Sequence, residues 1–262
     1  MASTGSVRRL DLHADGLRLA AELYLPEGDG PHPGLILCHG VPAKRVPDPN
    51  DRGYPLLAER FSGHGFAVLI FNFRGAGESE GNIDLLGWTR DLEAATDYMC
   101  KVDDVDASRL SVMGFSGGAA VTVSRAAKDS RIGSVVACAC PYRFFSIAEF
   151  SRVEEFLQHC RDVGTIRDPD FPPSVEEWVK GFEAINPIDC VQDISPRPIL
   201  FVHGANDETV DPSHAHILYE KAREPKDIRI IEGGDHRLRL CEPAMNAALE
   251  WLERMNGLAG ES

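Results

Sequence analysis

The first part of the chain alternates between apolar and polar positions. From Leu17 to Leu25 every second residue is apolar, which is the pattern of a strand with one buried face. Asp15-Gly16 stands directly before this stretch, and Asp-Gly is a strong signal for a tight turn between paired strands. Residues 6–25 are therefore predicted to form an antiparallel β-hairpin.

After Pro33 the apolar residues come in short continuous runs, which are typical of parallel strands covered on both faces. Apolar residues recur at helical spacing between these runs, for example from Leu85 to Met99 and from Met245 to Met255. Strands that alternate with helices predict the α/β class, with a mostly parallel central sheet and helices on both faces. The predicted strands are residues 35–38, 66–71, 110–113, 134–138, 199–202 and 228–231.

One interval, residues 142–186, breaks this alternation. It contains no strong strand but two helix-compatible stretches, at 147–163 and 174–184, with Asp168-Pro169 and Pro172-Pro173 between them. It is too long for a plain connection between two strands. We therefore predict that residues 1–141 and 187–262 form the core and that 142–186 is a small helical cap inserted over the carboxyl edge of the sheet.

Composition narrows the class of protein. The 262 residues include 27 Lys and Arg against 41 Asp and Glu, a net charge of −14, which argues against nucleic acid and anionic membrane surfaces as partners. No apolar run approaches the ~18 residues of a membrane span, and the first ten residues carry no signal-peptide pattern. Seven cysteines without CxxC spacing indicate reduced thiols. We expect a cytoplasmic protein with no metal and no cofactor; its oligomeric state is not defined, and a homodimer is left open.

The strongest local signal is Gly114-Phe115-Ser116-Gly117-Gly118. It matches G-x-S-x-G between a predicted strand and a helix predicted over 119–127, where a serine hydroxyl is exposed on a sharp turn. Taken alone, the pattern also fits a Gly-rich turn with an incidental serine. A serine hydroxyl becomes a good nucleophile only when a base removes its proton, so a histidine and a carboxylate are required.

Two later turns supply such residues. Asp207 follows the strand at 199–202 and His236 follows the strand at 228–231, so both are expected at the same sheet edge as Ser116. Asp211 and Glu208 are rivals for the acid, whereas Asp235 is expected to point away from its neighbour.

Acyl transfer also needs two N–H donors for the oxyanion of the tetrahedral intermediate. Gly117, at the start of the helix, is one candidate. Val41 is the other, because it lies in the loop after strand 35–38 and the next residue, Pro42, has no N–H. The alternative is that His39-Gly40 forms only a turn.

Other conspicuous residues receive structural interpretations. His203 is expected to pack or hydrogen-bond locally, and His214 and His216 are expected to diverge on a helix rather than bind a metal. The segment 72–79 has an arginine and two glycines, but its spacing matches no phosphate-binding loop, so a salt-bridged structural turn is predicted.

The segments LILCHG, FNFRGAGES, GFSGG, HGANDETV and GGDH occur in this order over roughly residues 34–240. In these segments the chain resembles the α/β-hydrolase superfamily, of the serine esterase and lipase kind. The predicted cap is similar to that of bacterial feruloyl and cinnamoyl esterases and of monoacylglycerol-lipase-like enzymes. The resemblance implies a nucleophile at Ser116, a triad acid at Asp207, a base at His236, and oxyanion donors at Val41 and Gly117.

The expected function is that of a serine carboxylesterase, which cleaves small-molecule esters with a short, medium or aromatic acyl group through an acyl-enzyme. A peptidase or a thioesterase of the same fold would use the same residues, and a non-catalytic binding module is a remote alternative. The cap aromatics are expected mostly to fill the cap's own core, with one or two facing the acyl pocket. They are Phe144, Phe145, Phe150, Phe156, Phe171, Trp178 and Phe182.

Overall fold

The computed structural model describes residues 4–44, 51–145 and 148–258. Its described strands form one eight-stranded sheet in the order β1-β2-β4-β3-β5-β6-β7-β8. The pairs β1–β2 and β2–β4 are antiparallel and the other neighbours are parallel, which confirms the predicted α/β class. The strands are β1 (Thr4–Ala14), β2 (Leu17–Pro26), β3 (His32–Cys38), β4 (Ala67–Phe71), β5 (Val105–Phe115), β6 (Ser134–Cys138), β7 (Ile199–Gly204) and β8 (Lys226–Ile231).

The N-terminal hairpin forms as predicted. Ala14 pairs with Leu17, and the two turn residues between them, Asp15 and Gly16, have φ of 52° and 79°. Two consecutive residues with positive φ characterise the turn whose twist matches that of the paired strands. The hairpin continues the sheet through β2, which pairs with β4.

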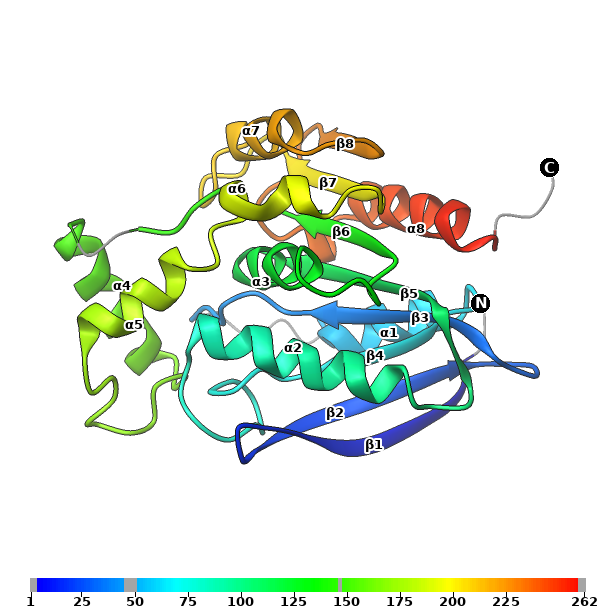
Figure 1. Ribbon diagram of the computed structural model, residues 1–262, viewed down its shortest axis with the longest axis horizontal. Coiled ribbons are helices and arrows are strands. Elements are labelled where there is room, and N and C mark those ends of the chain that lie inside the picture. The colour runs from blue at the N-terminus through cyan, green and yellow to red at the C-terminus, as the bar shows by residue number, and fades with distance from the viewer. Residues whose placement is uncertain (1–3, 45–50, 146–147, 259–262) are drawn as a thin grey trace.

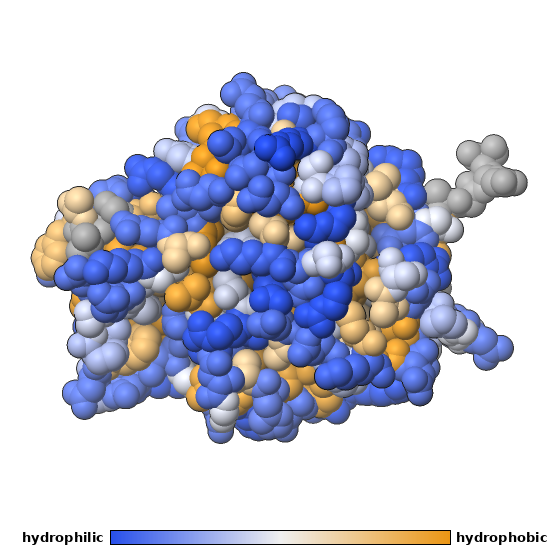
Figure 2. Space-filling view, viewed as in Figure 1, coloured by the Kyte–Doolittle hydropathy of each residue, from blue (hydrophilic) through white to orange (hydrophobic). Residues whose placement is uncertain are grey.

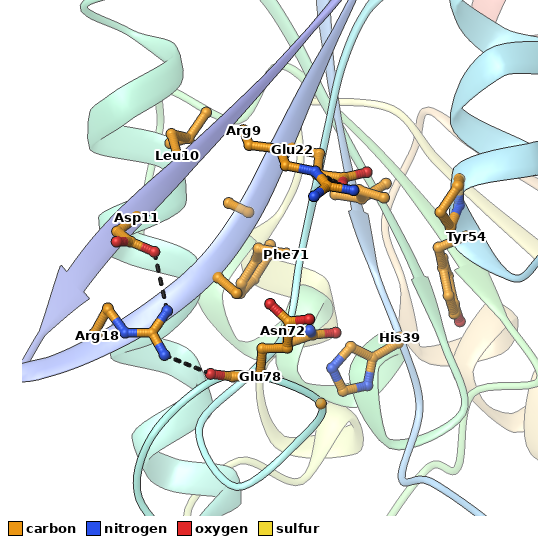
Figure 3. Close-up of a pocket in the computed structure, with 15 residues that line it drawn as sticks. Arg9, Leu10, Asp11, Arg18, Glu22, His39, Tyr54, Phe71, Asn72 and Glu78 are labelled. Atoms are coloured by element: carbon orange, nitrogen blue, oxygen red, sulfur yellow. Dashed lines mark hydrogen bonds and ion pairs between the residues drawn. The ribbon is translucent and has the colours of Figure 1, made fainter.

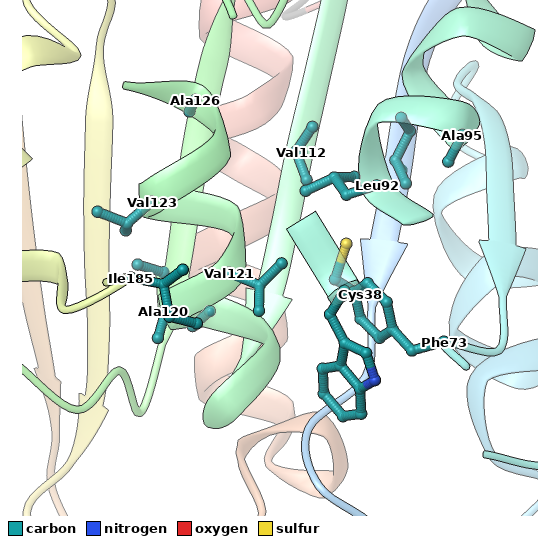
Figure 4. Packing of buried hydrophobic residues seen from close by; sticks show 14 of the residues in the cluster. Cys38, Phe73, Leu92, Ala95, Val112, Ala120, Val121, Val123, Ala126 and Ile185 are labelled. Carbon is teal, nitrogen blue, oxygen red and sulfur yellow. The ribbon is translucent and has the colours of Figure 1, made fainter. Parts of the chain in front are cut away.

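Helices cover both faces of the sheet, as predicted. In Figure 1, α2 and α3 lie in front of the strands and α1 and α8 lie behind them. The buried apolar residues accordingly form two clusters, and Figure 4 shows the first, where Phe73 and Leu92 pack near Val112 and Val121. The described helices are α1 (Tyr54–Ser62), α2 (Leu85–Met99), α3 (Gly117–Ala126), α4 (Phe150–Asp162), α5 (Val175–Glu183), α6 (Pro187–Cys190), α7 (Ser213–Lys221) and α8 (Glu242–Asn256), with 3-10 turns η1 (Val191–Asp193) and η2 (Leu238–Leu240).

Helices α4 and α5 lie beside the end of the sheet toward which the parallel strands point (Figure 1). The indole N–H of Trp178 donates to the carbonyl oxygen of Ile83 at 2.9 Å, which ties α5 to the start of α2. As expected, the aromatic side chains of this segment pack mostly on one another, for example Trp178 against Phe182 with ring centroids 4.6 Å apart. They also belong to the same apolar cluster as the residues under α2, so the two sets of buried side chains are continuous. The division of the chain into core and cap stays a prediction.

The face seen in Figure 2 is hydrophilic over most of its area, with scattered apolar side chains. Within the residues described above, none of the helices has the length and apolar character required to cross a membrane.

Candidate active site

Ser116 lies on the turn between β5 and α3 with φ of 53°, in the left-handed region that non-glycine residues rarely adopt. The turn depends on glycines at close approaches. A Cβ on Gly114 would lie 2.5 Å from Thr122 Oγ1, and a Cβ on Gly118 would collide with the carbonyl oxygen of His39. These two glycines let α3 begin directly against β3 and β5, so that the serine hydroxyl is presented at the sheet edge.

Three side chains that are distant in sequence meet at this edge. Ser116 Oγ lies 3.0 Å from His236 Nε2, and His236 Nδ1 lies 2.8 Å from Asp207 Oδ2. Both distances are those of hydrogen bonds. The structure therefore brings together all three residues that the sequence assigned to a triad, in an order that allows a proton to pass from the hydroxyl to the imidazole.

Asp207 is buried, and both of its carboxylate oxygens have hydrogen-bond partners. Its Oδ1 accepts the backbone N–H groups of Thr209 and Val210, each at 2.9 Å. Burial raises the pKa of this carboxyl, but hydrogen bonds from His203, His236 and the Val210 N–H outweigh burial and hold the pKa well below its usual range. The carboxylate therefore stays ionised and can stabilise a charged imidazole.

The rival carboxylates, Asp211 and Glu208, and the neighbouring Asp235 make no hydrogen bond or ion pair with His236 among the described residues. Asp211 accepts the N–H of Ser213 at 2.8 Å at the start of α7, and Asp235 pairs with Arg237 at 3.0 Å. Glu208 is exposed. The expectation that Asp235 points away from its neighbour agrees with this geometry.

His203 also lies at this site. The sequence predicted only local packing or a local hydrogen bond for it. It is completely buried, and its Nε2 lies 2.9 Å from the carbonyl oxygen of Val210 and 3.2 Å from Asp207 Oδ2. The local hydrogen bond was predicted, but the contact with the carboxylate was not. The four-residue separation of His203 and Asp207 across a tight turn is the signal that could have indicated it.

The loop after β3 lies directly against the nucleophile. A Cβ on Gly40 would lie 3.0 Å from Ser116 Cβ, and a Cβ on Gly117 would lie 3.9 Å from the backbone nitrogen of Val41. Within the described residues, the N–H groups of Val41 and Gly117 donate to no protein acceptor. Two free donors beside a serine hydroxyl can bind an oxyanion.

His39 fixes this loop, so His39-Gly40 is more than a turn. Its Nε2 accepts the N–H of Phe73 at 3.0 Å, which places the ring proton on Nδ1, 2.7 Å from the carbonyl oxygen of Gly40. Burial lowers the pKa of His39, which favours this neutral form. The ring thereby joins the loop after β3 to the loop after β4.

A cavity of about 390 Å³ opens at Ser116. None of the described cap aromatics lines it, so the predicted contribution of the cap to an acyl pocket is not observed; Leu238–Leu240 and Tyr54 form walls instead. The lining residues are His39, Gly40, Val41, Pro42, Ala43, Tyr54, Asn72, Ala76, Gly77, Phe115, Ser116, His236, Arg237, Leu238, Arg239 and Leu240.

The segment 72–79 is a salt-bridged turn, as predicted. Arg74 is buried and pairs with the buried carboxylate of Asp91 at 2.6 Å, and Trp88 Nε1 donates to the carbonyl oxygen of Arg74 at 3.0 Å. Asn72 and Gly77 of this turn also line the cavity, a role that its sequence pattern did not indicate.

The remaining histidines suggest no metal site. His214 Nδ1 accepts the backbone N–H of Tyr142 at 3.3 Å, whereas His216 is exposed. No cluster of three His, Cys, Asp or Glu side chains suited to a metal ion occurs among residues 4–44, 51–145 and 148–258.

A mostly parallel sheet with a serine on the turn after β5, and an aspartate and a histidine after β7 and β8, defines the α/β-hydrolase fold. The protein is an α/β-hydrolase. Residues 56–256 match the prolyl oligopeptidase family (Peptidase_S9), and the chain belongs to this family.

Individual relatives are distant. The chain is 30% identical over 139 residues to the quorum-quenching protein AidA of Acinetobacter baumannii, a match that covers 51% of this chain and 44% of that protein. Among solved structures, the α/β-hydrolase GrgF from Penicillium sp. sh18 has a TM-score of 0.75 at 23% identity, covering 96% of this chain and 99% of that chain. Est1E from Butyrivibrio proteoclasticus, solved with ferulic acid bound, has a TM-score of 0.68 at 21% identity. This match covers 94% of this chain and 96% of that chain.

Proposed function

We propose that the protein is a serine carboxylesterase with Ser116 as nucleophile, His236 as general base and Asp207 as the acid of the triad. The observation that carries this proposal is the continuous hydrogen-bonded chain from Ser116 Oγ through the imidazole of His236 to Asp207 Oδ2, with links of 3.0 and 2.8 Å. A chain of this geometry is what a serine hydroxyl needs in order to act as a nucleophile.

In the proposed reaction, His236 Nε2 removes the hydroxyl proton as Ser116 Oγ bonds to the ester carbonyl carbon. The imidazolium then gives this proton to the departing alcohol, which leaves an acyl-enzyme on Ser116. Water, deprotonated by the same imidazole, adds to the acyl carbon. The imidazolium returns the proton to Ser116 Oγ as the bond from Oγ to the acyl carbon breaks, which releases the acid. Asp207 holds the Nδ1–H tautomer and stabilises the imidazolium in both steps.

The N–H groups of Val41 and Gly117 are the proposed donors to the oxyanion. Each lies at the edge of the Ser116 turn and is free of other acceptors within the described residues. Loss of one such donor costs on the order of 3 kcal/mol of transition-state stabilisation in comparable sites.

The size and lining of the cavity support a small acyl group. Its volume of about 390 Å³ lies toward the lower end for ligand pockets, and Val41, Tyr54 and Leu238 supply apolar surface. An acyl group of short or medium length, or an aromatic one, suits this space. The ferulic acid bound by the structurally similar Est1E is consistent with an aromatic acyl group, as an analogy of fold alone.

The test is the Ser116→Ala variant assayed with p-nitrophenyl acetate and p-nitrophenyl butyrate. Turnover should fall by at least about 1,000-fold, because the variant has no nucleophile. Ser213→Ala, at an exposed serine on α7, is the matched control and should retain wild-type rates. A fluorophosphonate probe should label the wild type but not Ser116→Ala. If Ser116→Ala kept most of its esterase activity, the proposal would be wrong.

The family match favours one second candidate, hydrolysis of a peptide bond. The same residues would act on an amide, and also on a thioester, so the bond cleaved must be measured. The wild type is offered a p-nitrophenyl ester, a thioester and a prolyl p-nitroanilide in parallel. We expect the highest kcat/KM with the oxygen ester; a higher value with the anilide would instead assign a peptidase.

A further inference from the structure

A second hollow adjoins the candidate active site. It has a volume of about 590 Å³ and lies over β1, β2 and β4 beside the start of α1 (Figure 3). His39, Tyr54, Asn72 and Gly77 line both this hollow and the cavity at Ser116. A substrate held at Ser116 can therefore extend from one space into the other.

The hollow exists because β1 and the nearby part of β2 extend beyond α1, the helix that covers this face of the sheet. Glu22 on β2 pairs with Arg9 on β1 and with Ile70 on β4, so these side chains share one face of the sheet. Phe61 and Leu57 of α1 bury the apolar part of this face, whereas Arg9 and its neighbours on the hairpin stay uncovered. Ala20 projects from the same face and is too small to fill the space.

Paired charges surround the hollow. Arg9 Nε lies 3.1 Å from Glu22 Oε1, and Arg18 Nη1 lies 3.1 Å from Asp11 Oδ1, as Figure 3 shows for Arg18 and Asp11. Each pair places hydrogen-bond donors next to acceptors and nearly cancels the charge. The described lining residues include one further charged residue, Glu78. Donors and acceptors that lie side by side suit hydroxyl groups, which donate and accept at the same time.

Asn72 stands where the two spaces join. Its backbone is fixed, because its N–H donates to the carbonyl oxygen of Ala20 at 2.9 Å and its carbonyl oxygen accepts the Ser79 hydroxyl at 2.6 Å. Its side-chain amide lies against Gly77, where a Cβ would overlap it. Within the described residues that amide makes no hydrogen bond, so its N–H donors and its oxygen acceptor are all available to a ligand.

We propose that this hollow is a subsite for a hydroxyl-rich part of the substrate, such as a sugar or another polyol esterified to the acyl group at Ser116. This proposal rests on the proposed ester hydrolysis, and it specifies the alcohol part of the ester as one that carries several hydroxyl groups. The paired charges and the Asn72 amide would bind the hydroxyls, and Ile70 and Tyr54 offer apolar surface to the carbon skeleton.

The experiment fills the hollow and compares esters that share one acyl group. Ala20→Leu places a larger side chain in the space, and Ala20→Ser is the matched control that keeps it open. The substrates are 6-O-acetylglucose, ethyl acetate and hexyl acetate, each measured as kcat/KM. Each value is compared with that of the wild type for the same ester, so that the different intrinsic reactivities of the esters cancel.

Ala20→Leu should lower the ratio of kcat/KM for 6-O-acetylglucose to that for ethyl acetate by about tenfold, equivalent to about 1.4 kcal/mol. Ala20→Ser should keep the wild-type ratio. An unchanged ratio in Ala20→Leu would overturn the subsite. An equal loss with hexyl acetate would overturn the hydroxyl-rich assignment, because any long alcohol would then occupy the space.

Failure of the proposed function gives a different result. A wild type that hydrolyses no ester, or a Ser116→Ala variant that still does, contradicts the mechanism itself. Where Ser116→Ala hydrolyses no ester, binding of 6-O-acetylglucose to this variant by calorimetry tests the hollow without turnover. Binding that weakens about tenfold when Ala20→Leu is added supports the subsite, and binding unaffected by that change refutes it.

Discussion

Asp207 is held by more than its histidine partner in the proposed triad. His203 Nε2 lies 3.2 Å from the same carboxylate oxygen that contacts His236, and backbone N–H groups occupy the other oxygen. His203 is completely buried, and its Nε2–H is shared between this carboxylate and the carbonyl oxygen of Val210, 2.9 Å away, where no water competes. This contact helps to hold the pKa of Asp207 below its usual range, and we expect it to position the carboxylate.

Replacing this histidine should lower activity without removing any proposed catalytic group. We expect His203→Phe to reduce kcat/KM for p-nitrophenyl acetate by about tenfold, since a hydrogen bond to a charged group contributes about 1.5–3 kcal/mol. His203→Gln, which keeps a side-chain N–H donor, should recover part of the loss. A His203→Phe enzyme as active as the wild type would exclude the positioning role.

At the scale of the secondary-structure element, the connection from β5 to α3 gives the site its geometry. Ser116 has positive φ, and α3 approaches β3 so closely that Gly118 faces the carbonyl oxygen of His39. The nucleophile and the loop that carries Val41 are therefore placed by one packing contact between two elements.

An added methyl group should disrupt this contact. Gly118→Ala is expected to lower the free energy of unfolding by about 1–3 kcal/mol, because backbone atoms on both sides of the contact must move apart. Urea denaturation measures this change. In the stability control, Gly117→Ala, the new Cβ lies 3.2 Å from Val41 Cγ2, a side-chain atom that can shift. Equal stability of the two variants would contradict this account of the turn.

The pattern of apolar residues predicted the positions of most helices and strands, but not which elements pack against one another. All six strands predicted after Pro33 and the hairpin form, because burial on one or both faces leaves a direct trace in the sequence. β5 begins at Val105, earlier than predicted, since its first two residues, Val105 and Asp106, pair with the start of β3. α1 was not predicted. The aromatic residues of α4 and α5 were recognised as apolar, but periodicity does not indicate which surface an apolar stripe will contact.

At the scale of the whole molecule, ion pairs connect separate layers of an acidic protein. Asp129 is buried and lies 2.7 Å from Arg131 Nη2 and 2.9 Å from Arg125 Nη2. Arg131 also pairs with Asp97 of α2 at 2.6 Å. The hydrogen bonds from Arg131, together with those from Arg125, outweigh burial and hold the pKa of Asp129 well below its usual range. The cluster links α2 and α3 to the turn before β6.

The carboxylate of Asp129 should make the thermal stability of the protein decrease at acidic pH. Because its folded-state pKa is depressed, its contribution is complete above about pH 4, the ordinary carboxyl value, and is lost as the pH falls further toward the folded-state value. We expect the thermal midpoint to fall between pH 5 and pH 2, and Asp129→Asn to show a shallower fall from a lower starting value. Asp170→Asn, at an exposed carboxylate, is the charge-matched control. An identical slope in Asp129→Asn and the wild type would contradict this prediction.

The N-terminal hairpin has a consequence for solubility. β1 is an outer strand of the sheet among the described elements, and its free backbone groups could accept a strand from another molecule. Arg8, Arg9 and Asp11 are exposed along this strand, and charged side chains on an edge strand disfavour the addition of another strand. Arg9 and Asp11 also border the proposed sugar subsite, so redesigning that subsite with apolar side chains would remove a safeguard against aggregation at the same time.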